Sequence, residues 1–162
     1  MSSIITVLLF SVLLILTKIL DAELTCEPMP MDSYMCMHPK LGYNLTSLPN
    51  LLNHASVADA ALELHQFWPL VKVECSAALR PYLCSLYFPM CLPNQGTLSP
   101  CRRLCEAAYK GCAPLMRRFG FRWPRALRCG QWTDEGSCYE GPVDLLSHKP
   151  GDICLQRYNS LL

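Results

Sequence analysis

The sequence predicts a mainly α, compact domain that is stapled by disulfides and secreted. Eleven of its 162 residues are cysteine, a density typical of small domains formed in an oxidising compartment. Segments 56–68, 76–88 and 99–120 have helical spacing or composition. An apolar run opens the chain, and no second run of that length follows it. These three observations together favour a helical, secreted and disulfide-rich fold.

The N-terminal run from Ile4 to Leu16 is apolar apart from two hydroxyl side chains. It is too short to span a bilayer comfortably, so a secretory signal peptide cleaved near Ala22 is a better interpretation than an uncleaved anchor. The mature chain of about 140 residues has the usual size of one domain.

We therefore predict three parts: a signal peptide at 1–22, one domain at 23–140, and a tail at 141–162. The tail lacks hydrophobic periodicity, so we expect it to be poorly ordered.

The segment from 99 to 120 is the predicted central helix. Ser99 is a suitable N-cap, Pro100 suits the first turn, and Gly120 is a natural stop. Pro114 removes a helical hydrogen bond and clashes one turn back, so we expect a kink or a break after Cys112.

Three cysteines share one face of this helix. At about 100° per residue, Cys105 and Cys112 lie about 40° and 20° round from Cys101, with Ala108 between them. Small side chains on this face would let other segments approach closely, and three thiols can tether three parts of the chain. The alternative is an ordinary buried face.

Other elements follow from local signals. SVAD at 56–59 resembles a capping start for a helix that runs to Trp68, where Pro69 ends it. The segment 76–88 contains Pro81, so it forms either two short pieces or one kinked helix. LPNQG at 92–96 is a turn, and a short helix follows Pro124. The two prolines after Cys26 predict an extended or looped arm.

Charge and motifs exclude several functions. The net charge of +1 argues against a strongly basic nucleic-acid binder, although seven Arg and one Lys face a single acid, Glu106, between 102 and 128. That run is either a solvated face or a polyanion-binding patch.

A disulfide-rich phospholipase would need a His–Asp pair near the central helix and a glycine-rich calcium loop, and neither is present. Zinc is disfavoured because the four histidines are isolated and the cysteines form no two close pairs. We therefore predict no enzyme, metal or cofactor.

Ten cysteines and several words between them carry a resemblance. The words are GYNLTSLPNLLNH, HQFWPLVKVECS, YLCSLYFPMC, PCRRLCE and GCAPLMRRFGFRWPRALRC. From 26 to 138 the chain resembles the Frizzled-type cysteine-rich domain. The resemblance implies a compact, mostly helical fold with a short β-strand pair and five bridges. These would be Cys26 with Cys91, Cys36 with Cys84, Cys75 with Cys112, Cys101 with Cys138, and Cys105 with Cys129.

The resemblance also implies a function. Members of this family bind Wnt proteins, in part by receiving the palmitoleoyl chain of the ligand in an apolar groove. Carried over by matching words, the groove residues are Gln66, Phe67, Pro69, Val73, Leu86, Met116, Phe119 and Phe121, and Trp68 and Leu115 lie near a second protein contact. The alternative is that some of these residues are ordinary core residues.

Three readings of the function stay open. The first is a secreted Wnt-binding module that modulates Wnt signalling in the extracellular space. The second is the ectodomain fragment of a seven-pass Frizzled receptor at the cell surface. The third is a sterol or fatty-acid binding module. The departures from the family pattern, such as Leu86 where methionine is frequent, bear on lipid affinity.

Three further predictions concern modification and partners. Asn44 begins the one Asn-x-Thr sequon, and we expect it to be glycosylated. Cys154 is left over after the ten paired cysteines, so we expect a free thiol that can form a disulfide-linked homodimer. The basic run at Arg117, Arg118, Arg122, Arg125 and Arg128 is a candidate site for sulfated matrix polysaccharide.

Overall fold

The structure is a computed structural model that describes residues 26–30, 35–37 and 41–142. The predicted signal peptide, the tail beyond residue 142 and Cys154 lie outside the described residues. Among the helices that are described, none has both the length and the hydropathy that crossing a membrane requires.

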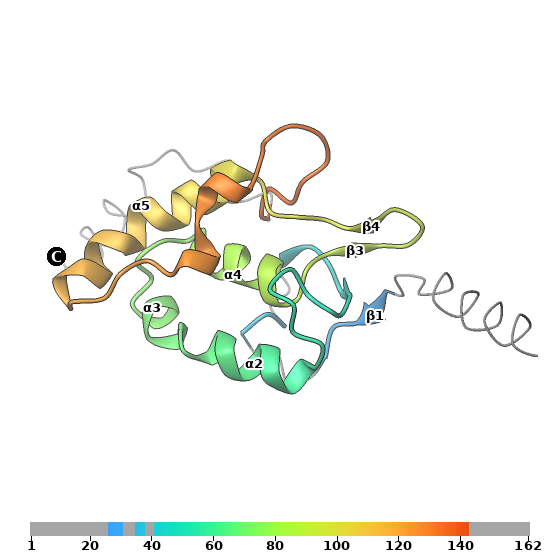
Figure 1. Ribbon diagram of the computed structural model, residues 1–162, viewed down its shortest axis with the longest axis horizontal. Helices are drawn as coiled ribbons and strands as arrows, with labels where there is room; N and C mark the ends of the chain where they lie inside the picture. Colours follow the sequence, from blue (N-terminus) through green and yellow to red (C-terminus); the bar gives the residue numbers. More distant parts are fainter. Residues whose placement is uncertain (1–25, 31–34, 38–40, 143–162) are drawn as a thin grey trace, which may run out of the picture.

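Helix α4 (Leu79–Tyr87) forms the centre of the domain. Every one of its residues except Arg80 is buried. It packs against α5 (Arg102–Arg118) on one side and α2 (Val57–His65) on another (Figure 1). Pro81 lies in the first turn of α4, where its missing N–H has no helical partner to lose. The segment is therefore one helix, and the expectation of two short pieces is wrong.

Helix α2 begins as predicted but ends earlier. Ser56 Oγ accepts a hydrogen bond of 3.1 Å from the Asp59 backbone N–H, which confirms the capping start. The helix ends at His65, and Trp68 opens a separate short helix, α3 (Trp68–Lys72). Pro69 lies in the first turn of α3, where its fixed φ is favourable. The expectation that one helix runs to Trp68 is therefore wrong.

The N-terminus of α5 differs from the prediction. Cys101 is its N-cap, and Ser99 does not cap it. Instead, Asp134 Oδ1 accepts from the Arg103 N–H at 3.0 Å. The Ser99 backbone carbonyl accepts from the Tyr139 N–H at 2.8 Å. A distant segment thus supplies the cap, which local sequence signals do not indicate.

Helix α5 continues through Pro114 as one element. The expected break after Cys112 is therefore wrong. Ala113 and Met116, on either side of the proline, are both buried, and this packing holds the last turns in helical form. Tertiary contacts routinely override a local preference of this kind.

Two small antiparallel strand pairs flank the helices. Strand β1 (Glu27–Pro28) pairs with β2 (Leu45–Thr46), and β3 (Cys91–Leu92) pairs with β4 (Gly96–Thr97). The second pair confirms the turn at 92–96. The predicted short helix after Pro124 consists of two single 3₁₀ turns, η2 (Arg125–Leu127) and η3 (Cys129–Gln131). The mainly α fold class is confirmed, with two strand pairs where one was expected.

Five disulfides staple these elements. Three of them end on the cysteine face of α5, as the spacing of those thiols suggested. In the chain-entropy model each bridge contributes about 3 to 4 kcal/mol to stability, given loops of 24 to 65 residues. The pairs are those that the family resemblance implied: Cys26–Cys91, Cys36–Cys84, Cys75–Cys112, Cys101–Cys138 and Cys105–Cys129.

Close packing at Gly111 accompanies the bridge between Cys75 and Cys112. A Cβ placed on Gly111 would lie 2.4 Å from the carbonyl oxygen of Cys75 and 2.7 Å from Cβ of Ser76. Backbone atoms cannot move aside as a flexible side chain can. Gly111 is therefore required for the segment after α3 to lie against α5.

We expect Gly111→Ala to lower the free energy of unfolding by about 1 to 3 kcal/mol, because the added methyl group overpacks this contact. Gly130→Ala is the matched control, since nothing lies within 4 Å of a Cβ at that position. Urea unfolding of both oxidised variants measures the difference. Equal stability of the two variants would contradict the packing argument.

Buried tyrosines join the elements through their hydroxyl groups. Tyr82 donates to the Leu127 carbonyl at 3.1 Å, and Tyr139 donates to the Leu41 carbonyl at 2.7 Å. Burial raises the pKa of Tyr82 to about 12, although the hydrogen bond from Trp132 opposes the shift. Burial also raises the pKa of Tyr139.

These shifts predict alkaline destabilisation. A tyrosine in the unfolded chain ionises near pH 10, whereas Tyr82 in the folded protein resists ionisation up to about pH 12. Stability is therefore complete below about pH 10 and falls as the pH rises from about 10 to about 12, because the unfolded state then binds fewer protons. Urea unfolding at about pH 9 and about pH 11, with free thiols blocked, tests this. Equal stability at the two pH values would refute it.

Candidate functional site

One end of the molecule carries the candidate binding surface. Helix α3 and the C-terminal end of α5 lie at this end (Figure 1). The bridge from Cys75 to Cys112 ties the segment after α3 to α5, with 5.0 Å between the two Cα atoms. Ser76 Oγ adds a hydrogen bond of 3.1 Å to the Ala107 carbonyl. The relative position of the two helices is thus fixed covalently.

A Schellman motif ends α5 and sets the direction of the chain that follows. The Gly120 N–H donates to the Arg117 carbonyl at 3.0 Å, and the Phe121 N–H donates to the Met116 carbonyl at 2.9 Å. Gly120 has a φ of 80°, which glycine adopts without strain. The predicted stop at Gly120 is therefore confirmed, and its geometry is well defined.

The two phenylalanines beside Gly120 are solvent-exposed. Phe119 is 72% exposed and Phe121 is 66% exposed. In many Schellman motifs the residue after the glycine packs back onto the helix, but here the ring of Phe121 stays largely in water. Large apolar side chains that are solvent-exposed side by side are typical of a binding surface.

Further apolar residues at this end belong to α3 and its flanks. Val73 and Pro69 are exposed, and Phe67 is half-buried with its ring 6.3 Å from the ring of Tyr87. Gln66, next to Phe67, is also exposed. We call the apolar members of this group the apolar end surface: Phe67, Pro69, Val73, Phe119 and Phe121.

Two of the expected groove residues are buried. Leu86 is 0% exposed and belongs to the core cluster, because it lies on the central helix α4 with neighbours on all sides. Leu86 therefore does not line the open surface, contrary to its expected place. Met116 is 9% exposed and is also buried, in the last turn of α5.

The two residues expected at a second protein contact are half-buried. The indole of Trp68 stacks near the ring of His65 at 6.4 Å, and the Lys72 ammonium lies 5.0 Å from its centroid. These contacts hold the orientation of Trp68. Leu115 lies on α5, one residue from Met116. Their role in a contact stays a prediction.

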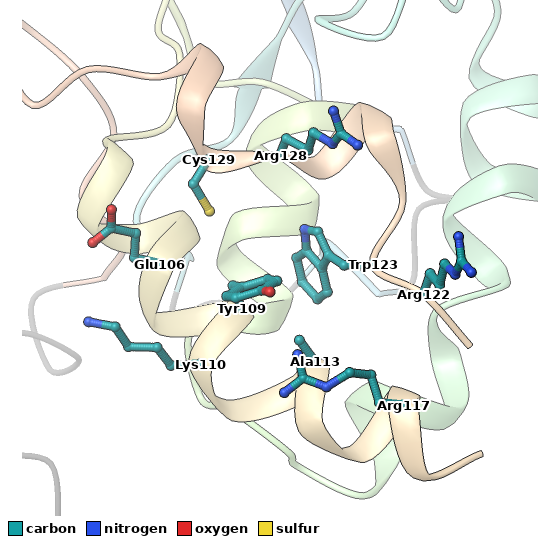
Figure 2. Close-up of a pocket in the computed structure, with 9 residues that line it drawn as sticks. All are labelled: Glu106, Tyr109, Lys110, Ala113, Arg117, Arg122, Trp123, Arg128 and Cys129. Carbon is teal, nitrogen blue, oxygen red and sulfur yellow. The ribbon is translucent and has the colours of Figure 1, made fainter. Parts of the chain in front are cut away.

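A pocket of about 780 Å³ lies on another side of α5. Figure 2 shows the rings of Tyr109 and Trp123 at its centre, with cationic side chains around them. Sequence reasoning noticed the cations but missed the two rings, because Tyr109 lies on α5 and Trp123 lies in the irregular segment that follows it. The lining residues are Glu106, Tyr109, Lys110, Ala113, Arg117, Arg122, Trp123, Arg128 and Cys129.

Two polar clusters link distant segments of the fold. Cys101 and Cys138, which lie near Asp134, are joined to each other, so they are not thiolate ligands. His54 Nε2 lies 2.8 Å from Glu63 Oε2, and Glu63 also accepts from the Tyr87 hydroxyl. This second cluster links α2 to α4.

Asn44 is exposed at the start of β2. Its backbone carbonyl oxygen accepts a hydrogen bond of 2.9 Å from the Met29 N–H. The predicted glycosylation at this position stays a prediction.

The geometry places the protein in the class of small, disulfide-stapled, mainly helical domains that present an exposed apolar surface. Comparison with known families is more specific. The Fz domain family matches residues 26–136, and the chain belongs to that family.

Several known proteins are similar to this chain. It is 41% identical over 138 residues to Frizzled-8 of Xenopus laevis, covering 85% of this chain and 21% of that protein. It is 54% identical over 90 residues to human Frizzled-5, covering 55% of this chain and 15% of that protein. The chain thus spans about a fifth or less of the length of these relatives.

Solved structures show the same fold. The selenomethionine-labelled cysteine-rich domain of Smoothened matches with a TM-score of 0.53 and 28% identity, over 70% of this chain and 96% of that one. The Xenopus Smoothened cysteine-rich domain in complex with cyclopamine matches with a TM-score of 0.50 and 30% identity, over 67% of this chain and 94% of that one.

Proposed function

We propose that this domain binds lipidated Wnt proteins outside the cell and that the apolar end surface receives the palmitoleoyl chain of the ligand. The main support is the pair of exposed rings, Phe119 and Phe121, that the Schellman motif holds at the end of α5. The similarity to Frizzled-8 and Frizzled-5 supports the choice of partner. The domain acts by binding and has no catalytic role in this proposal.

The physical chemistry of the end surface suits an acyl chain. Each methylene group removed from water contributes about 0.8 kcal/mol, so a long chain gains substantial affinity from a modest apolar track. The exposed side chains of Val73, Phe119 and Phe121 supply such a track, and Met116 in the last turn of α5 has a flexible side chain that can adapt. Leu86 is not needed for this contact.

Two finer questions belong to the proposal. A secreted module would act by capturing its ligand, whereas a receptor ectodomain would pass the binding event to a membrane region. Sequencing of the transcript beyond Leu162 discriminates these cases.

A free sterol or fatty acid is the second candidate ligand, because one similar domain was solved in complex with cyclopamine. Mass spectrometry of lipids extracted from the purified protein tests that candidate.

We expect Phe121→Asp to reduce the affinity for lipidated Wnt at least tenfold, since a carboxylate would have to lose its water against an acyl chain. Folding should be unaffected because Phe121 is largely exposed. Leu62→Asp is the matched control, since Leu62 on α2 is 75% exposed and lies outside the end surface. Biolayer interferometry with acylated Wnt measures both. Equal affinities of the two folded variants would sink the assignment.

The Schellman motif supplies an independent prediction. Gly120→Ala and Gly136→Ala each place an alanine at a positive φ, 80° and 76° in the native protein, and each should cost about 1 to 2 kcal/mol of stability. Gly120→Ala alone should also weaken Wnt binding, because it moves Phe119 and Phe121. Chemical denaturation and binding assays on the two variants separate these effects. If both variants bind as the wild type does, the motif does not position the ligand contact.

A further inference from the structure

The pocket beside Tyr109 and Trp123 carries an excess of positive charge. Its lining includes the cations Lys110, Arg117, Arg122 and Arg128 and a single acid, Glu106. Glu106 is engaged by Arg102, whose Nε lies 3.0 Å from Glu106 Oε1. With the residues that the structure describes, none of the four lining cations forms an ion pair. The pocket therefore holds a positive field that nothing described within it neutralises.

The aromatic floor of the pocket is held in place before any ligand arrives. Trp123 Nε1 donates to the Leu127 carbonyl at 2.6 Å. The rings of Tyr109 and Trp123 meet edge to face, with centroids 5.5 Å apart. The bridge between Cys105 and Cys129 ties the wall of the pocket to α5. A rigid site of this kind loses little entropy on binding.

We propose that this pocket binds a sulfated sugar unit of an extracellular polysaccharide. Its volume of about 780 Å³ lies within the range of about 300 to 1,000 Å³ that is typical of small-molecule sites. Aromatic faces pack against the C–H faces of a sugar ring, and Arg guanidinium groups pair with sulfate oxygens in two-point contacts.

The distribution of the cations favours a polysaccharide over a single small anion. In Figure 2, Lys110, Arg117, Arg122 and Arg128 surround the rings on different sides. Such an arrangement suits several anionic groups along one chain. The five disulfides imply an oxidising environment, where sulfated polysaccharides are an abundant polyanion.

The pocket differs from the basic run in the sequence. Of the five arginines at 117, 118, 122, 125 and 128, the pocket includes Arg117, Arg122 and Arg128 but neither Arg118 nor Arg125. All five are exposed. The pocket also shares no residue with the apolar end surface, so this proposal and the proposed Wnt binding stand separately.

Paired substitutions test the site. Arg117→Gln with Arg122→Gln removes two cations from the pocket, and Arg118→Gln with Arg125→Gln removes the same charge outside it. Isothermal titration calorimetry would give the affinity of each variant for a heparin oligosaccharide of defined length. The desulfated form of the same oligosaccharide is a second control. We expect the pocket pair to lose about tenfold or more and the outside pair to lose less than about threefold. The desulfated sugar should bind much more weakly than the sulfated one.

A footprint on the wild-type protein keeps the proposal testable if the pocket pair does not fold. Phenylglyoxal modification, read by mass spectrometry, should be slowed by the oligosaccharide at Arg117, Arg122 and Arg128 but not at Arg118 and Arg125. Equal losses in the two variant pairs, uniform protection of all five arginines, or no binding by the wild type at low salt would each overturn the proposal.

Discussion

The contact between the cysteine face of α5 and the rest of the chain is the constraint on which this domain depends. Cys105 and Cys112 on this face are fully buried, and both are bridged to segments distant in the sequence. Gly111 lets the backbone at Cys75 approach to a distance that any side chain would block. A small domain buries a limited core, so covalent links and close backbone contact supply stability that a larger protein would obtain from apolar burial.

The same helix presents two different surfaces near its C-terminus. Phe119, just past its last residue, belongs to the apolar end surface, and Arg117 in its last turn lines the basic pocket. After the helix ends, Phe121 belongs to the apolar end surface and Arg122 lines the basic pocket. Because the Schellman motif fixes the backbone between these pairs, both surfaces are built on one rigid turn. A domain held by polysaccharide at the pocket would therefore keep the apolar surface available for a lipidated partner.

Errors in the sequence predictions arose where distant segments compete with local signals. Ser99 has the chemistry of an N-cap, but its backbone carbonyl pairs with the Tyr139 N–H, and Asp134 caps α5 instead. Leu86 matches a groove position in the family pattern, yet it is fully buried near the C-terminal end of α4. In both cases the outcome depends on residues dozens of positions away, which no local pattern contains.

By itself the sequence determined the mainly helical class, the capped start of α2 at Ser56, the stop at Gly120 and the clustering of three thiols on one helix face. These features follow from backbone preferences and helical periodicity, which act within a few residues. The tertiary structure alone decided that Phe119 and Phe121 are exposed while Leu86 is buried. It also brought Tyr109 and Trp123 together in one pocket. Burial and ring contacts arise from packing between segments that are distant in the chain, and no local sequence pattern reveals which faces meet.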